Sequence, residues 1–540
     1  MALNIRDPRE AQAINGKWFI KLLKKGINVV TASDGGLVYP PAHPDQSYVE
    51  SIEAAAYEGG VSFYMNGQEP GFVEHMAMLA ATLSNTIKRI TSYELFDYST
   101  VKSREEMAKP WIDYIARSSY LLQQGRFVAD VAYFYGEEAP LGSQVWDGYF
   151  NDVPQRYGYD FINPHALLNL LSVQDGELVS DGGARYRVLY LGGTSERMTL
   201  PVLKHIAQLV ESGATLVGNA PKGSPSLHDD PQVFSALVRQ LWNGEVVNHV
   251  GKGRVIKGGD IEAALALIDI APDVVVEAAA KDAALDIAFV HRQLKGGDIY
   301  FLSNRSNHSH QLQARFRVTG KAPQIWRADD GSRVPVSYSM QANETIVPLS
   351  FSPEESYFVV FVDDTEARSH TVPKTNAHVV SALSGSWTVT FQAGRGAPDT
   401  AIVLPQLISL SEHAEPAIKY FSGIATYSKN FSLPTTPEAG QSLWLELGKV
   451  GDIAEVLVNG RSVGSAWHPP YRVDISSAVH AGDNELVVRV ANRWVNRLIG
   501  DAQPDVEKMT FTVTPNYQAD APLRPSGLMG PVLLVTDAEP

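Results

Sequence analysis

The sequence of 540 residues contains no cysteine, which excludes disulfides, thiolate metal sites and cysteine nucleophiles. It also has no apolar run of the roughly 18 residues that a membrane-spanning helix needs. Acidic residues outnumber basic ones by 60 to 45, and the formal net charge is −15. Because phosphate binding needs a basic surface, we expect no nucleic-acid partner, and we expect no membrane partner either.

A signal peptide is not evident in the first residues, "MALNIRDPREAQAINGKWF". This stretch lacks the basic segment followed by an apolar one that directs export. The expected location of the encoded chain is therefore the cytoplasm.

The overall composition is that of an ordinary globular protein, with 44% hydrophobic and 19% charged residues. A chain of this length is too long for one hydrophobic core, so several domains are expected. The spacing of apolar residues predicts a multidomain protein in which an α/β part is followed by an all-β part. The predicted regions are 1–102, 103–126, 127–250, 251–375 and 376–540.

Residues 1–102 alternate helical and strand patterns, such as the helical "EAQAINGKWFIKLLKKG" followed by the apolar "INVVTA". Pro70 and Gly71 lie at the start of a predicted helix, where free backbone N–H groups suit an anion. A plain tight turn between a strand and a helix explains the same two residues.

Three segments of this region resemble dihydrodipicolinate-reductase-like and diaminopentanoate-dehydrogenase-like NAD(P)-dependent oxidoreductases: "GINVVTAS", "AAAYEGGVSFYMNGQEPGF" and "ITSYELFDYST". The resemblance implies a nicotinamide near the "VVTAS" segment and a substrate pocket beside the loop from Gly67 to Phe72. The family's phosphate-binding G-x-G-x-x-G turn has no counterpart ahead of Val29. We therefore interpret residues 1–102 as an oxidoreductase-like fragment and expect no cofactor, with NAD(P) bound only if the fragment is functional. The cofactor-binding candidates are Thr31, Ser33, Gly67, Pro70 and Gly71.

The middle of the chain changes from helices to strands. Residues 106–126 have the spacing of one amphipathic helix, with Pro110 in its first turn and Gly125 as its C-cap. Strand-then-helix units in 127–250 predict a parallel sheet of flavodoxin-like or amidotransferase-like type. Short alternating strands predict an antiparallel β-sandwich in 251–375, and strands continue in 376–540, where Asn459-Gly460 is a hairpin signal.

A second resemblance runs through this larger part of the chain. The blocks that carry it are "AKPWIDYIARSSYLLQQGRFVADVAYFYGEEAP", "YRVLYLGG", "LVESGATLVGNAPKGSPSL", "IKYFSGIATYSKNFSL", "GSAWHPPYRVDI", "NRWVNRLIGD" and "PSGLMGPV". Together they resemble glycoside hydrolase family 106, the α-L-rhamnosidases. The last four also resemble the galactose-binding-like, sugar-binding jelly roll found beside family 2 glycosidases. The resemblance implies a carbohydrate partner, namely rhamnose-containing glycans or glycosides, and a family that is often exported.

Catalysis by this chain is not expected from the resemblance. A glycosidase of this kind needs two carboxylates at the anomeric carbon. The family's barrel strands precede the helix that matches residues 106–126, so neither catalytic glutamate maps onto a residue here. The weak substitutes are Glu137 and Asp147, with Glu138 and Asp152 beside them and the aromatic Trp146, Tyr149 and Phe150 in the same loop. The interpretation that we favour is a solvated pair at a strand end, beside a loop that packs its aromatic side chains onto a neighbouring part.

The jelly roll supplies the carbohydrate-binding candidates. Aromatic rings can stack on a sugar, and interleaved cations can bond its hydroxyl groups. The candidates are Trp467, His468, Tyr471, Arg472, Arg493 and Trp494, with Arg497 beside them. The alternative is that these residues build an interface with a neighbouring domain. His308 and His310 could ligate a metal, but no third ligand is evident, and an exposed strand face is the alternative that we favour.

Four hypotheses follow for the whole chain. It is the C-terminal part of an α-L-rhamnosidase-like hydrolase without its catalytic barrel, an active glycosidase with a remodelled site, an oxidoreductase fused to carbohydrate-binding domains, or a non-catalytic carbohydrate-binding protein. The missing Gly-rich turn and barrel strands favour the first and the last. The junction at about residues 100–106 is interpreted as a gene fusion or as an artefact that joins two genes. Few contacts are expected between residues 1–102 and the rest.

Overall fold

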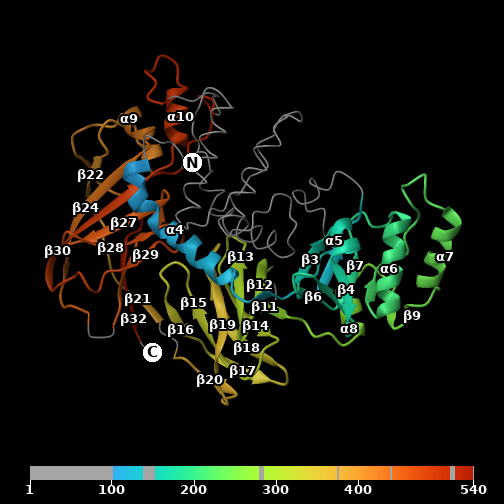
Figure 1. Cartoon of the computed structure of the whole chain (residues 1–540). Helices are drawn as coiled ribbons and strands as arrows, with labels where there is room; N and C mark the ends of the chain where they lie inside the picture. Colours follow the sequence, from blue (N-terminus) through green and yellow to red (C-terminus); the bar gives the residue numbers. More distant parts are fainter. Residues whose placement is uncertain are drawn as a thin grey trace, which may run out of the picture.

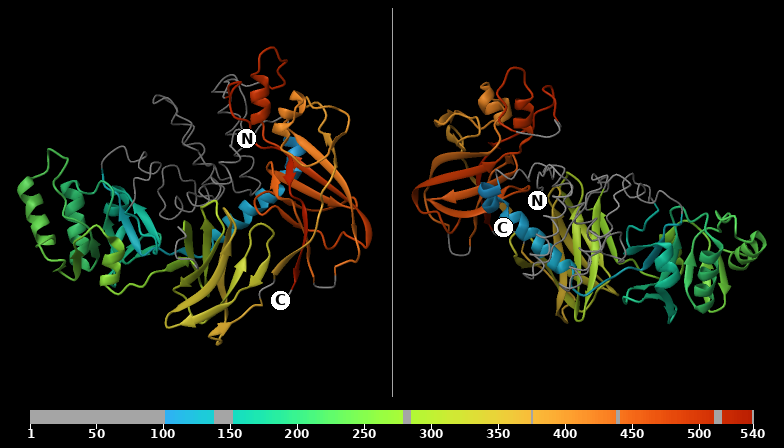
Figure 2. Two further views of the ribbon diagram at one scale, coloured as in Figure 1. Left: turned by 180° about the vertical axis from the view of Figure 1, so that it is seen from behind. Right: turned by 45° about the horizontal axis from the view of Figure 1, so that its top comes forward.

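The computed structural model describes residues 101–137, 152–278, 285–373, 376–437, 441–510 and 517–538. In these ranges an α/β unit, a β-sandwich and a jelly roll lie in a row, with the sandwich in the middle (Figures 1 and 2). The oxidoreductase-like fragment, its cofactor-binding candidates and its expected lack of contacts with the rest all fall outside the described residues.

The helix α4 (Val101–Leu122) lies along the sandwich and reaches the jelly roll (Figure 1). Pro110 stands inside it, so the predicted start at residue 106 with this proline in the first turn is wrong. Gly125 follows the helix at φ +59°. A Cβ there would lie 2.1 Å from the backbone oxygen of Gln293, so the turn into the next strand requires glycine.

The apolar face of α4 is buried in a cluster that joins three parts of the chain. Tyr114 and Leu122 pack there with Phe301 and Phe358 of the sandwich and with Trp467 of the jelly roll. The Tyr114 hydroxyl also bonds the Ser356 hydroxyl at 2.6 Å. The helix therefore fixes the sandwich to the jelly roll.

The α/β unit is built on a six-stranded sheet whose strands are parallel except at one edge. Its strands, in spatial order, are β3 (Tyr159–Ile162), β2 (Val131–Phe134), β7 (Val188–Leu191), β8 (Thr215–Val217), β10 (Gly253–Ile256) and β9 (Val247–Val250). The central strands are continuous apolar runs because both faces of a parallel sheet are covered. The parallel strands confirm the sequence prediction, but the pairing of β10 with β8 carries the unit past the predicted boundary at residue 250.

Helices and a small meander cover this sheet. The helices are α5 (Pro164–Asn169), α6 (Leu200–Ser212), α7 (Pro231–Leu241) and α8 (Ile261–Leu267). The meander consists of β4 (Leu171–Gln174), β5 (Glu177–Ser180) and β6 (Arg185–Tyr186). One apolar cluster includes side chains of α5, α6 and α7, and a second includes side chains of α8.

The β-sandwich packs two antiparallel sheets face to face. The first contains β1 (Arg126–Phe127), β12 (Ile287–Leu294), β13 (Gly297–Asn304), β19 (Ser356–Asp364), β15 (Lys321–Trp326) and β16 (Arg333–Pro335). The second contains β11 (Val274–Ala278), β14 (His310–Phe316), β18 (Glu344–Phe351), β17 (Tyr338–Gln341) and β20 (Ser369–His370). On β13, Tyr300 and Leu302 face the sandwich core while Ile299 and Phe301 face α4, which explains why this strand is apolar on both faces.

The jelly roll has a four-stranded and a six-stranded sheet. The first is β21 (Asn376–Ala382), β32 (Leu533–Ala538), β25 (Leu443–Glu446) and β29 (Arg472–Asp474). The second is β23 (Ile402–Leu404), β22 (Trp387–Phe391), β24 (Ile424–Leu433), β30 (Gly482–Ala491), β27 (Ile453–Val458) and β28 (Arg461–Ala466). The smaller elements are η2 (Leu410–Glu412), α9 (Pro416–Lys419), α10 (Val495–Asp501), β26 (Lys449–Val450) and β31 (Leu528–Gly530).

The predicted hairpin at Asn459-Gly460 is confirmed. Both residues have positive φ, at 52° and 77°, and they join β27 to β28. Among the helices that the structure describes, none is long and apolar enough to span a membrane.

Candidate functional site

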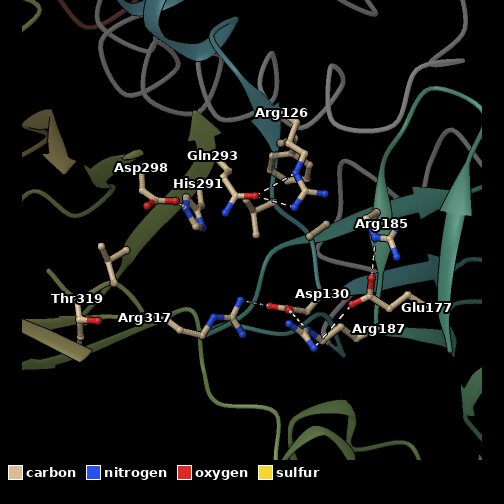
Figure 3. Close-up of a pocket in the computed structure, with 14 residues that line it drawn as sticks. Arg126, Asp130, Glu177, Arg185, Arg187, His291, Gln293, Asp298, Arg317 and Thr319 are labelled. Carbon is tan, nitrogen blue, oxygen red and sulfur yellow. Dashed lines mark hydrogen bonds and ion pairs between the residues drawn. The ribbon is translucent and has the colours of Figure 1, made fainter. Parts of the chain in front are cut away.

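A polar pocket of about 380 Å³ lies where the α/β unit meets the β-sandwich (Figure 3). The chain crosses between the two units here. After the turn at Gly125, β1 pairs with β12, so that Arg126 lies opposite Gln293, and the next residues lead into β2. The side chains that line the pocket belong to Arg126, Phe127, Val128, Ala129, Asp130, Glu177, Arg185, Arg187, His291, Gln293, Asp298, Arg317, Val318 and Thr319.

Asp130 is the buried anion of this pocket, with 3% of its surface exposed. Its two carboxylate oxygens bond the guanidinium of Arg187 at 3.3 Å and that of Arg317 at 2.9 Å (Figure 3). Burial raises the pKa of Asp130, against the opposing effect of Arg317. Since Arg317 belongs to the sandwich and Asp130 to the α/β unit, this ion pair also ties the two units together.

A second buried group lies on the sandwich side. His291 bonds Asp273 through Nδ1 at 2.9 Å and Asp298 through Nε2 at 3.0 Å. The hydroxyl of Tyr300 donates to the other oxygen of Asp273 at 3.0 Å, and its ring stacks on the imidazole. Burial alone would lower the pKa of His291, but the two carboxylates raise it to about 9. The imidazole is therefore held as a cation at neutral pH.

Glu177 lies on the α/β side of the pocket between two arginines. Its Oε2 accepts a hydrogen bond from Arg185 Nε at 2.7 Å, and its Oε1 lies 3.8 Å from Arg187 (Figure 3). Arg126, on the other side, donates to the amide oxygen of Gln293 at 2.7 and 3.1 Å. The pocket thus presents several N–H donors beside carboxylates that are already bonded, an arrangement for binding rather than for proton transfer. In the described ranges no group of three or more His, Asp or Glu side chains could hold a metal ion.

The predicted carbohydrate-binding residues lie in the jelly roll and not at this pocket. Trp467 is 7% exposed, and its ring packs against Tyr114 of α4 at 5.1 Å and against His468 at 4.4 Å. His468 bonds Asp329 of the sandwich at 2.9 Å. Burial alone would lower the pKa of His468, but the Asp329 carboxylate raises it. Both side chains therefore build the interface between domains, which is the alternative that the sequence left open.

The remaining candidates in the jelly roll also make internal contacts. Tyr471 belongs to the apolar core. The guanidinium of Arg472 lies over the Trp444 ring at 4.2 Å. Arg493 pairs with Asp452 at 2.7 Å. Trp494 is buried beneath Arg395, and Arg497 pairs with Asp501 at 2.8 Å. A sugar-binding role for these residues stays a prediction.

The carboxylates proposed as catalytic substitutes have separate positions. Glu137 accepts hydrogen bonds from the backbone N–H of Thr199 at 2.6 Å and from its hydroxyl at 3.0 Å, at the start of α6. Asp152 accepts from the hydroxyls of Tyr133 at 2.6 Å and Tyr190 at 2.9 Å. Asp147 lies outside the described residues, as do Glu138, Trp146, Tyr149 and Phe150.

The two histidines considered for a metal differ in exposure. His310 is buried at the start of β14 and bonds the Ser306 hydroxyl at 2.8 Å, whereas His308 is exposed in the preceding loop. The prediction that both lie on an exposed strand face is therefore wrong, because His310 is on the strand but buried and His308 is exposed but lies before the strand.

Sequence reasoning missed every charged residue of the pocket. Asp130 directly precedes the apolar strand β2, and His291 interrupts the alternation of "IAFVHRQL" at an inward position. A charged side chain at a buried position of a strand is a usable signal, because such groups are seldom buried unless they are paired.

The comparisons with known proteins agree with the fold. Residues 94–340 match the family described as alpha-L-rhamnosidase (glycoside hydrolase family 106), and residues 414–520 match the glycosyl hydrolase 2 galactose-binding domain-like family. These matches give the chain a glycoside-hydrolase-like region followed by a galactose-binding-like domain. The first match begins within the stretch that the sequence analysis assigned to an oxidoreductase-like fragment, and no comparison supports that fragment.

Two relatives define the likeness more closely. The rhamnosidase from Novosphingobium sp. PP1Y is 51% identical, with a TM-score of 0.72, over 80% of this chain and 41% of that chain. A protein of Formosa agariphila named "Putative beta-glucuronidase" is 24% identical over 82% of this chain and 58% of that protein. The chain thus spans about half the length of these relatives.

Proposed function

We propose that the described part of this chain is the carbohydrate-binding, non-hydrolysing portion of an α-L-rhamnosidase-type glycoside hydrolase. The observation that carries the proposal is the 51% identity to the Novosphingobium rhamnosidase over four fifths of the chain, with the matching fold. The substrate class that this implies is a rhamnose-containing glycan or glycoside. The NAD(P)-dependent reaction considered from the sequence gains no supporting observation.

The environment of the carboxylates supports the non-hydrolysing part of the proposal. A glycosidase needs one carboxylic acid and one carboxylate that reach the two faces of the glycosidic bond. Asp130 is buried under two arginines, and Glu177 is paired with Arg185. Glu137 accepts a hydrogen bond from the backbone N–H of Thr199 at the start of α6. Each of these carboxylates already has protein partners that would have to be displaced before it could take part in hydrolysis.

Binding is tested by electrophoresis of the full chain in gels that contain a neutral rhamnan, with a neutral glucan as the matched control. We expect the chain to be retarded in the rhamnan gel and not in the glucan gel. Equal mobility in both gels would contradict carbohydrate binding of the proposed specificity.

Hydrolysis is tested on the same preparation with an aryl α-L-rhamnoside. We expect no release of the phenol above the buffer rate, because the carboxylates described above are already bonded to protein groups and offer no free acid and base pair. Saturable release that disappears in Glu137→Gln or Asp147→Asn would overturn the proposal in favour of a remodelled catalytic site.

A further inference from the structure

The pocket between the α/β unit and the sandwich carries a surplus of positive charge in a protein whose net charge is −15. Four arginines line it. Three of them, Arg185, Arg187 and Arg317, pair with Asp130 and Glu177, and Arg317 also lies 3.7 Å from Asp273. In the described part of the chain the fourth, Arg126, bonds the neutral amide of Gln293 and has no carboxylate partner. A cleft with such a surplus attracts anions.

Donors also remain for a ligand. A guanidinium has five N–H groups in a planar fork. Among the described residues, Arg126 uses Nε and Nη2 on Gln293, and Arg185 uses Nε on Glu177, which leaves the other N–H groups of both for a further acceptor. Both guanidinium groups lie at the pocket, one from β1 and one from β6 (Figure 3).

The size and the remaining polar groups suit a single sugar residue. About 380 Å³ falls within the range of pockets that hold small ligands, roughly 300–1,000 Å³. Gln293, Asp298 and Thr319 add amide, carboxylate and hydroxyl groups that can bond sugar hydroxyls. A planar carboxylate matches the guanidinium fork with two parallel hydrogen bonds.

We propose that this pocket binds the carboxylate of an acidic sugar residue, with Arg126 and Arg185 as its principal ligands. The inference that the pocket binds an anion rests on the charges and free N–H groups of the pocket and does not depend on the proposed function. That the anion belongs to a saccharide rests on the proposed function. The pocket would then select glycans that contain a uronic acid, a substrate feature that neither the family match nor the rhamnosidase likeness specifies.

The test is calorimetric titration of the full chain with D-galacturonate, and with D-galactose as the matched ligand without the carboxylate. We expect saturable binding of galacturonate at least tenfold tighter than that of galactose. Raising the salt concentration from 50 to 500 mM should weaken it severalfold because the contact is ionic. Equal affinity for the two sugars, or no binding of galacturonate, would overturn the proposal.

Substitutions of Arg126 and Arg185 test whether these two residues form the galacturonate site. Arg126→Gln combined with Arg185→Gln should weaken galacturonate binding at least tenfold without lowering the thermal midpoint, since neither arginine holds the buried Asp130. Arg126→Lys keeps the charge but loses the fork, so it should weaken binding severalfold. It also provides the test if the double variant fails to fold. Arg305→Gln removes a comparable ion pair, with Asp286, elsewhere on the sandwich and should change nothing. Unchanged affinity in the Arg126 variants would contradict the assignment.

The two proposals fail separately. Retention on neutral rhamnan without a preference for galacturonate would overturn only the pocket inference. Galacturonate binding lost in the arginine variants, without retention on rhamnan, would support the pocket and contradict the proposed function.

Discussion

At the scale of single residues, two ion pairs of the described structure connect neighbouring domains. Asp130 and Arg317 join the α/β unit to the sandwich, and Asp329 and His468 join the sandwich to the jelly roll. Removing one partner of such a partly buried pair destabilises the fold because the other charge is left without compensation.

His291 makes folding stability depend on pH. Its pKa is about 9 in the folded chain and about 6.5 in an unfolded one. A raised pKa means that the charged form stabilises the fold, fully below pH 6.5 and progressively less as the pH rises through 9. We expect the free energy of unfolding to fall by about 2–3 kcal/mol between pH 6.5 and 9.5.

Urea unfolding across that range measures the effect. The His291→Gln variant should be less stable at pH 6.5 and should depend less on pH than the wild type, with the remaining dependence coming from His468, whose pKa Asp329 also raises. His308→Gln, at an exposed histidine, should follow the wild type. Stability that stays constant or increases with pH in the wild type would show that His291 is not held as a cation.

At the scale of elements, α4 is the part that couples two β domains. Its Tyr114 ring lies 5.1 Å from Trp467 in a cluster that also contains sandwich residues. The helix itself was predictable from its apolar spacing, and so were the parallel sheet and the Asn459-Gly460 hairpin. An interface role for Trp467 was left open as an alternative, but its partner Tyr114 could not be named because that residue lies far away in the sequence, on α4.

A double-mutant cycle tests this coupling. Trp467→Ala should cost about 3–5 kcal/mol of unfolding free energy, as expected for a buried tryptophan. Together with Tyr114→Ala it should show an interaction energy of about 0.5–1.5 kcal/mol. Tyr120→Ala, at an exposed tyrosine of the same helix, is the control and should cost little. Additive losses from Trp467→Ala and Tyr114→Ala would mean that the two rings are not coupled.

The turn after α4 gives a second prediction at this scale. Gly125→Ala places a methyl group 2.1 Å from the backbone oxygen of Gln293, whereas Gly183→Ala meets no atom within 4 Å. Both glycines have positive φ, so the second variant measures the backbone strain alone. We expect Gly125→Ala to lose about 2 kcal/mol more than Gly183→Ala in chemical unfolding. Equal losses would indicate that the turn relaxes and that the close approach is unimportant.

At the scale of the whole molecule, the likeness to an α-L-rhamnosidase covers the three described units in the order of the sequence. Sequence motifs were sufficient to predict this likeness because each motif is a short continuous segment. Sequence motifs could not predict the pocket, because its arginines come from β1, from β6 and from the residues that follow β6 and β14. Only the folded chain brings them to one place (Figure 3).

Saturation-transfer-difference NMR with 4-nitrophenyl α-L-rhamnoside tests the central claim most directly, because successive spectra report binding and hydrolysis together. The account predicts transfer from the protein to the rhamnose protons, stronger than to those of 4-nitrophenyl β-D-glucoside, while no free rhamnose appears over many hours. Transfer no stronger than to the glucoside would contradict rhamnoside recognition, and steady growth of the free rhamnose signals would contradict the non-hydrolysing assignment.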